Sequence, residues 1–118
     1  MALHLFAGLR VRDFDAARRW YERLLGEATF SPHATEAVWT LAEERSVYVV
    51  EHADGAGRSV ATIFVDDLDG HMAAIAARGL EPDEIETYSN GVRKAIYRDP
   101  DGNELGFGGG PQHSSSST

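Results

Sequence analysis

The chain has 118 residues, no cysteine and a formal net charge of −8. This length suits one domain that can bury a core without disulfides or metal. The lack of cysteine excludes disulfides, thiolate ligands and cysteine nucleophiles. The acidic charge argues against nucleic acid as a partner, and no apolar run reaches the roughly 20 residues of a membrane span. Without a signal-peptide pattern at its start, the protein is expected to be cytoplasmic and to bind neither nucleic acid nor membranes.

The first half of the chain predicts a strand, a helix and three further strands. Apolar residues alternate in the first strand, as expected when one face lies on a core. Asp13 or Asp15 can cap the helix, whose apolar positions have helical spacing. The expected elements are a strand at residues 3–11, a helix ending at Gly26, a short strand at 28–30 with a break at 31–33, strands at 37–41 and 46–51, and a linker at 53–57.

The second half repeats this order. Val-Arg-Asp-Phe-Asp at residues 11–15 matches Val-Asp-Asp-Leu-Asp at residues 65–69, and the same offset superposes strand, cap, helix and helix stop. The terminal hairpin has a turn from Asp99 to Asn103, with the Pro, Asp, Gly and Asn residues that tight turns need. The expected elements are a strand at residues 60–65, a helix capped by Asp66 or Asp67 and ended by Gly79, a strand at 84–88, a turn at 89–91 and the hairpin at 97–107.

This duplication predicts an α+β fold. Two tandem βαβββ modules, at about residues 3–52 and 58–107, would form one domain over residues 1–107. Their strands would make a cupped, mostly antiparallel sheet with the helices on its outer face. Residues 108–118 are rich in Gly and then Ser, a composition that predicts a disordered tail.

Three motifs carry a family resemblance: V-R-D-F-D-A-A-R-R-W-Y-E-R-L-L-G in the first half, V-D-D-L-D before the second helix, and Y-R-D-P-D-G-N-E-L near the end. Together with the repeat, they make the chain resemble the vicinal oxygen chelate superfamily. That superfamily holds glyoxalases, extradiol dioxygenases, fosfomycin-modifying enzymes and bleomycin-resistance proteins, so the resemblance implies a fold and not one activity. It also implies a homodimer in which each pocket is completed by both chains.

The resemblance places metal ligands at positions that carry few metal donors here. Metal-dependent members use His or Gln in the first strand of each module, and those positions are Phe6 and Val60. The terminal carboxylate position is Gly106, and the remaining one is Val49 or Glu51. Since such sites need three or four N or O donors, we expect no metal and no cofactor.

A pocket without metal would be apolar, with a few polar groups that fix the ligand's orientation. Arg10 could pair with an acidic ligand or with Glu51. Acid or base catalysis would have to use Glu51, Glu104, His33 or His52, whose roles spacing does not reveal. Glu104 is the polar feature expected on the last strand. The candidate ligand-binding residues are Phe6, Gly8, Arg10, Trp39, Glu51, Val60, Thr62, Phe64, Glu104 and Gly106.

These features favour a metal-independent binding protein, similar to bleomycin-resistance proteins, that sequesters an aromatic or amphipathic compound. The alternative is a glyoxalase-like or dioxygenase-like enzyme with a relocated metal site or a metal-free acid/base site. The acidic charge of the chain would favour a cationic ligand.

Overall fold

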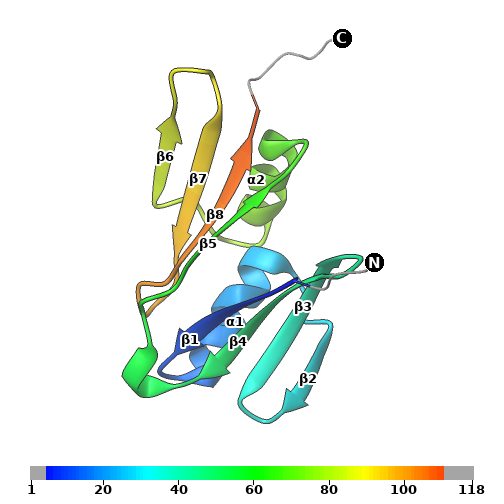
Figure 1. Ribbon diagram of the computed structural model, residues 1–118, viewed down its shortest axis with the longest axis vertical. Helices are drawn as coiled ribbons and strands as arrows, with labels where there is room; N and C mark the ends of the chain where they lie inside the picture. The colour runs from blue at the N-terminus through cyan, green and yellow to red at the C-terminus, as the bar shows by residue number, and fades with distance from the viewer. Residues whose placement is uncertain (1–4, 111–118) are drawn as a thin grey trace.

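The computed structural model describes residues 5–110, which form two four-stranded sheets and two α-helices (Figure 1). The first module comprises β1 (Leu5–Val11), α1 (Phe14–Leu25), β2 (Phe30–His33), β3 (Glu36–Ala42) and β4 (Arg45–Glu51), and the second, after the 3-10 turn η1 (Ala53–Gly55), comprises β5 (Val60–Phe64), α2 (Leu68–Ala77), β6 (Glu84–Thr87), β7 (Arg93–Arg98) and β8 (Glu104–Gly109). The strand orders are β1-β4-β3-β2 and β5-β8-β7-β6. In each sheet the first pair is parallel and the other pairs are antiparallel. The predicted tandem βαβββ fold is confirmed, with a separate sheet for each module.

Both α-helices begin at the aspartate of the repeated motif. Asp13 Oδ1 accepts a hydrogen bond from the Ala16 amide at 3.2 Å, and Asp67 Oδ1 accepts one from the Gly70 amide at 3.0 Å. Each carboxylate satisfies an amide that has no partner inside its helix. Of the two aspartates that the sequence offers for each cap, these are the ones used.

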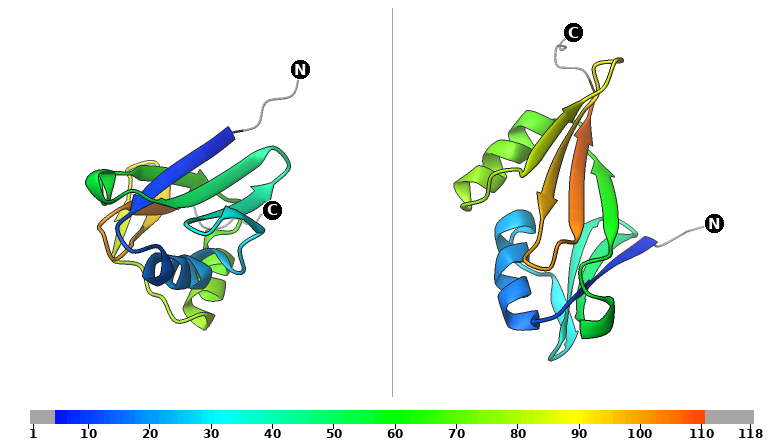
Figure 2. Two further views of the ribbon diagram at one scale, coloured as in Figure 1. Left: turned by 90° about the horizontal axis from the view of Figure 1, so that it is seen from below. Right: turned by 90° about the vertical axis from the view of Figure 1, so that its left-hand side faces the viewer.

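The strands have a covered face and an open face. Both helices lie on the same side of the two sheets (Figure 2), and strand residues that point to that side are buried in one core shared by both modules. The side chains on the other side form the open face, where Phe6 is 52% exposed, Val60 67% and Phe64 74%. The covered-face residues of the strands include Leu9, Val11, Trp39, Val47, Val49, Ala95, Tyr97, Leu105 and Phe107.

Polar contacts join the modules behind the sheets. The Arg78 guanidinium donates to the carbonyl oxygens of Arg23 at 2.7 Å and Leu24 at 2.9 Å, so a cation from the end of α2 stabilises the C-terminus of α1. The Tyr21 hydroxyl of α1 donates to the carboxylate of Asp99 in the β7–β8 turn at 2.8 Å. The repeated units are therefore held by specific contacts as well as by the shared core.

Several strand boundaries differ from the sequence prediction, those of β2 and β8 among them. The expected break at residues 31–33 is wrong, because β2 runs to His33; this edge strand tolerates Pro32, which has no amide to donate, with an irregular register between Phe30 and His33. β8 runs to Gly109, two residues past the expected boundary at 107, because Gly108 and Gly109 pair with β7. Residues 1–4 and 111–118, with the start of the first predicted strand and most of the predicted tail, lie outside the described residues.

Neither described helix has the length and apolar character required to cross a membrane.

Candidate functional site

The pairing of the strands identifies which residues of the two modules are equivalent. Phe6 pairs with Ser46 in the first module, and Val60 pairs with Glu104 in the second. Two residues further along, Gly8 pairs with Tyr48 and Thr62 pairs with Gly106. Tyr48 is therefore the first-module counterpart of Gly106. The family resemblance suggests Val49 or Glu51 for this position, but both of those side chains are on the other face of β4 because neighbouring residues in a strand alternate.

The four positions that would hold a metal in this fold carry Phe6, Tyr48, Val60 and Gly106. Only the tyrosine offers an oxygen donor. The Lys94 side chain also lies across Gly106, where an added Cβ would meet its Cε at 2.8 Å. Among residues 5–110, no group of three or more histidine, aspartate or glutamate side chains is arranged to hold a metal ion. These residues do not fit a metal centre of the kind that the resemblance implies.

An aromatic surface takes up the corresponding part of the first module's open face. The Tyr48 ring lies over Gly8, where an added Cβ would come within 2.5 Å of the ring. Phe6 meets Tyr48 edge to face, with ring centroids 6.2 Å apart and an interplanar angle of 85°. Glycine at position 8 is thus required for the ring to lie flat on the sheet. The arrangement presents aromatic surface with a hydroxyl at its border.

A pocket lies beside this surface, where β1 and β4 meet η1 and the linker to β5. It has a volume of about 510 Å³. Its wall combines open-face strand residues with polar side chains from the linker, which is why a reading of the strands alone finds only part of it. The lining residues are Gly8, Arg10, Tyr48, Val50, His52, Asp54, Gly55, Arg58 and Ser59.

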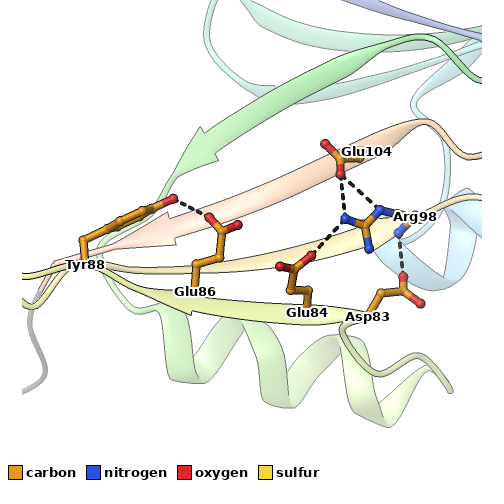
Figure 3. Close-up of polar contacts among 6 residues, drawn as sticks. All are labelled: Asp83, Glu84, Glu86, Tyr88, Arg98 and Glu104. Atoms are coloured by element: carbon orange, nitrogen blue, oxygen red, sulfur yellow. Dashed lines mark hydrogen bonds and ion pairs between the residues drawn. The ribbon is translucent and has the colours of Figure 1, made fainter.

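The open face of the second module is charged (Figure 3). Arg98 donates to Glu104 at 2.8 and 3.0 Å and to Glu84 at 2.9 Å, and the hydrogen bonds to Glu84 and then Glu104 raise the pKa of its guanidinium. The Tyr88 hydroxyl donates to Glu86, which raises the pKa of the phenol. Glu104, the polar feature expected on the last strand, belongs to an ion-paired cluster on this face.

Two predicted site residues lie on the covered face. Trp39 is 2% exposed, and its indole donates to the Gly26 carbonyl at 2.8 Å. Glu51 Oε1 accepts a hydrogen bond from the Phe14 amide at 3.2 Å, so Glu51 stabilises the start of α1 and does not pair with Arg10. Strand alternation sends both side chains away from the open face.

The remaining predicted residues are on open faces, but in different places. Gly8 and Arg10 line the first pocket. Thr62 and Phe64 line a second cleft of about 630 Å³ between the modules, together with apolar residues such as Leu5 and Leu41. The other predicted residues on open faces, which line neither cavity, are Phe6, Val60, Glu104 and Gly106.

The candidate acids and bases have individual partners. His33 Nε2 lies 2.9 Å from Glu36 Oε1 at the edge of the first sheet. His52 Nδ1 accepts a hydrogen bond from the Gly55 amide at 3.1 Å. With Glu51 at a helix start and Glu104 on Arg98, the four candidates are not brought together.

Comparisons with known proteins agree with this architecture. The chain matches the family described as the Glyoxalase/Bleomycin resistance protein/Dioxygenase superfamily over residues 2–107. The crystal structure of a glyoxalase / bleomycin resistance protein from Catenulispora Acidiphila DSM 44928 is 52% identical and superposes with a TM-score of 0.90, covering 93% of this chain and 100% of that chain.

More distant structures share the fold. A lactoylglutathione lyase from Agrobacterium tumefaciens is 17% identical with a TM-score of 0.74, over 93% of this chain and 95% of that chain. A bleomycin-binding protein complexed with bleomycin is 22% identical with a TM-score of 0.68, over 92% of this chain and 97% of that chain. A comparison with curated proteins finds no match. The motifs, the tandem modules and the family match together show that the chain belongs to the Glyoxalase/Bleomycin resistance protein/Dioxygenase superfamily.

Proposed function

We propose that the protein binds a small molecule with an aromatic or amphipathic body, without a metal ion, on the open face of its first module. One observation carries this proposal. The four positions that would hold metal ligands in this fold are occupied by Phe6, Tyr48, Val60 and Gly106. An aromatic surface next to a pocket whose polar groups can fix the ligand's orientation is the usual character of a site for an organic ligand. A ligand that covers about 100 Å² of apolar surface here would gain about 2.5 kcal/mol.

Sequestration of a toxic compound is the biological role that we favour. The bleomycin-binding protein that shares the fold is described in complex with bleomycin, so this architecture can hold a drug. At 22% identity it does not indicate the same ligand, and the residues that line the present pocket must decide what binds. Resistance by binding requires affinity but no bond making or breaking, which fits acid and base candidates that lie apart.

We also propose a homodimer. Large apolar side chains remain exposed on both modules, and Phe64, 74% exposed, is next to the cleft between them. Exposed apolar groups of this size commonly mark contact surfaces. The other exposed large apolar residues are Leu5, Phe6, Phe30, Leu41, Val60, Ile85 and Tyr88. In a dimer, the partner would cover these groups and close the open face.

Metal analysis and ligand titration test the function together. Protein purified without chelator should contain no stoichiometric zinc, manganese, nickel or iron. A panel of aromatic and amphipathic compounds, screened by thermal shift and then by isothermal titration calorimetry, should yield saturable binding that EDTA does not change. Stoichiometric metal with turnover of a substrate would overturn the proposal and support the enzyme alternative.

A separate measurement tests the dimer. Analytical ultracentrifugation at micromolar concentration should show a dimer for the unmodified chain and a monomer for Phe64→Glu. Sedimentation of the unmodified chain as a monomer would refute this part of the proposal.

A further inference from the structure

The pocket at the end of β1 and β4 contains two arginines in a protein of net charge −8. Arg10 lies on the open face of β1, and Arg58 comes from the linker before β5. The Arg10 side chain lies over Gly55, where an added Cβ would meet Cδ at 2.7 Å and Nη1 at 2.9 Å. A glycine at this point of η1 thus lets the guanidinium lie along the pocket wall.

The two guanidinium groups have no carboxylate partner within residues 5–110. Arg98, on the open face of the second module, differs from them, because it forms ion pairs with Glu84 and Glu104. Among the residues that line the pocket, Asp54 alone is acidic, and no ion pair joins it to either arginine within the described chain. The pocket therefore carries excess positive charge on an acidic protein. Planar guanidinium groups suit the paired oxygens of carboxylates, phosphates and sulfonates.

Three neutral side chains add hydrogen-bond donors to the pocket. Because His52 Nδ1 accepts the Gly55 amide, the neutral imidazole carries its proton on Nε2 and can donate there. The hydroxyls of Tyr48 and Ser59 also line the pocket, and neither has a hydrogen-bond partner within the part of the chain that the structure describes. Arginines and neutral donors converge on one pocket, as recognition of an oxyanion requires.

We propose that this pocket is an anion subsite that binds the carboxylate, phosphate or sulfonate group of an organic acid through Arg10 and Arg58. The apolar body of the ligand then lies on Phe6 and Tyr48. This assignment rests on the proposed binding function and names its ligand class. We therefore expect an anionic ligand here, although the overall charge favours a cationic one. The donors in the pocket act at short range, whereas salt screens the more distant net charge.

Two fluorescent probes test the subsite because they share one aromatic body. 8-Anilino-1-naphthalenesulfonate carries a sulfonate, and N-phenyl-1-naphthylamine lacks it. The unmodified protein should bind the sulfonate at least about tenfold more tightly, which corresponds to about 1.4 kcal/mol. In the double variant Arg10→Gln/Arg58→Gln, the dissociation constants of the two probes should agree within about threefold, with that of the neutral probe unchanged. Sodium phosphate at constant ionic strength should displace the probe that carries the sulfonate and leave the neutral probe bound.

Arg19→Gln is the matched control. It removes one positive charge from an exposed position of α1 outside the pocket, so the preference for the sulfonate should remain. Equal binding of both probes by the unmodified protein, with no effect of the double variant, would overturn the anion subsite and leave the proposed function standing. Saturable binding of neither probe would count against the proposed function, and the subsite would be rejected with it. Near-UV circular dichroism of each variant confirms that the fold is retained.

Discussion

Asp99 offers the sharpest test of how the β7–β8 turn is held, because one buried carboxylate satisfies four donors. The residue is 5% exposed. Its Oδ1 accepts from the amides of Asp101 and Asn103, both at 2.9 Å, and its Oδ2 accepts from the Tyr21 hydroxyl and Asn103 Nδ2, both at 2.8 Å. Asn103 in turn reaches the Arg10 carbonyl at 2.7 Å. The carboxylate thus joins the turn to α1 and, through Asn103, to β1.

Replacing Asp99 by Asn changes this network without creating a cavity. An amide has one acceptor oxygen, so its NH₂ group must face two of the four donors. The Tyr21 hydroxyl can turn and accept, but Asn103 cannot reverse its amide, since its Oδ1 already accepts from the Ser59 amide at 2.9 Å. At least one buried donor loses its partner, and the bonds that remain lose the charge of the acceptor. With about 1 to 3 kcal/mol for each such loss, the free energy of unfolding should fall by about 3 to 5 kcal/mol.

Urea unfolding followed by circular dichroism measures this loss. For a domain of this size the melting temperature should fall by about 15 to 25 °C. Asp101→Asn is the matched control. Among residues 5–110, the Asp101 side chain accepts only the Arg12 amide, at 3.0 Å on the surface, so this substitution should lower the free energy of unfolding by about 1 kcal/mol or less. If the free energy of unfolding of Asp99→Asn were within about 1 kcal/mol of that of the unmodified chain, this account of the network would be refuted.

Two further predictions follow from single residues. Burial, and then the charge of Asp99, raises the pKa of the Tyr21 phenol, so above pH 10 this phenol ionises in the unfolded chain but not in the folded one. The free energy of unfolding should therefore fall by about 1.4 kcal/mol per pH unit above pH 10. Urea midpoints measured between pH 9 and 11 should fall less steeply for Tyr21→Phe than for the unmodified chain. Equal slopes would contradict this reasoning. Gly57 has φ +84° and lies where a Cβ would come within 2.3 Å of the Asp101 carbonyl, whereas Gly26 has φ +89° and open space. Gly57→Ala should therefore lower the free energy of unfolding by more than 2 kcal/mol and Gly26→Ala by about 1 kcal/mol, and thermal melts that reverse this order would show that the close approach is not limiting.

Local sequence signals were sufficient for most of the fold. Each helix cap could be narrowed to two aspartates, Asp13 or Asp15 and Asp66 or Asp67, because a helix start needs a side-chain acceptor next to its free amides. The turn from Asp99 to Asn103 could be recognised from residue types that tolerate its backbone angles. The repeat then indicated that both halves share one topology, as the two sheets confirm.

The candidate site was less accessible because it depends on strand parity. A shift of one residue exchanges the two faces of a strand. The difference between Tyr48 on the open face and Glu51 at the start of α1 was therefore decided by the pairing of β1 with β4. Trp39 is in the core because the pairing of β3 with β4 places it opposite Val47, on the covered face.

The sequence by itself determined the modules, the two candidate aspartates for each helix cap, the terminal turn and the lack of metal donors at Phe6, Val60 and Gly106, because these depend on residue type and on neighbours along the chain. Tertiary structure alone decided which charges are neutralised and which remain available. Arg98 meets two glutamates across its sheet, whereas Arg10 and Arg58 line one pocket formed where a strand end and a linker come together. Such meetings depend on strand register and chain path through space, which local residue patterns do not encode.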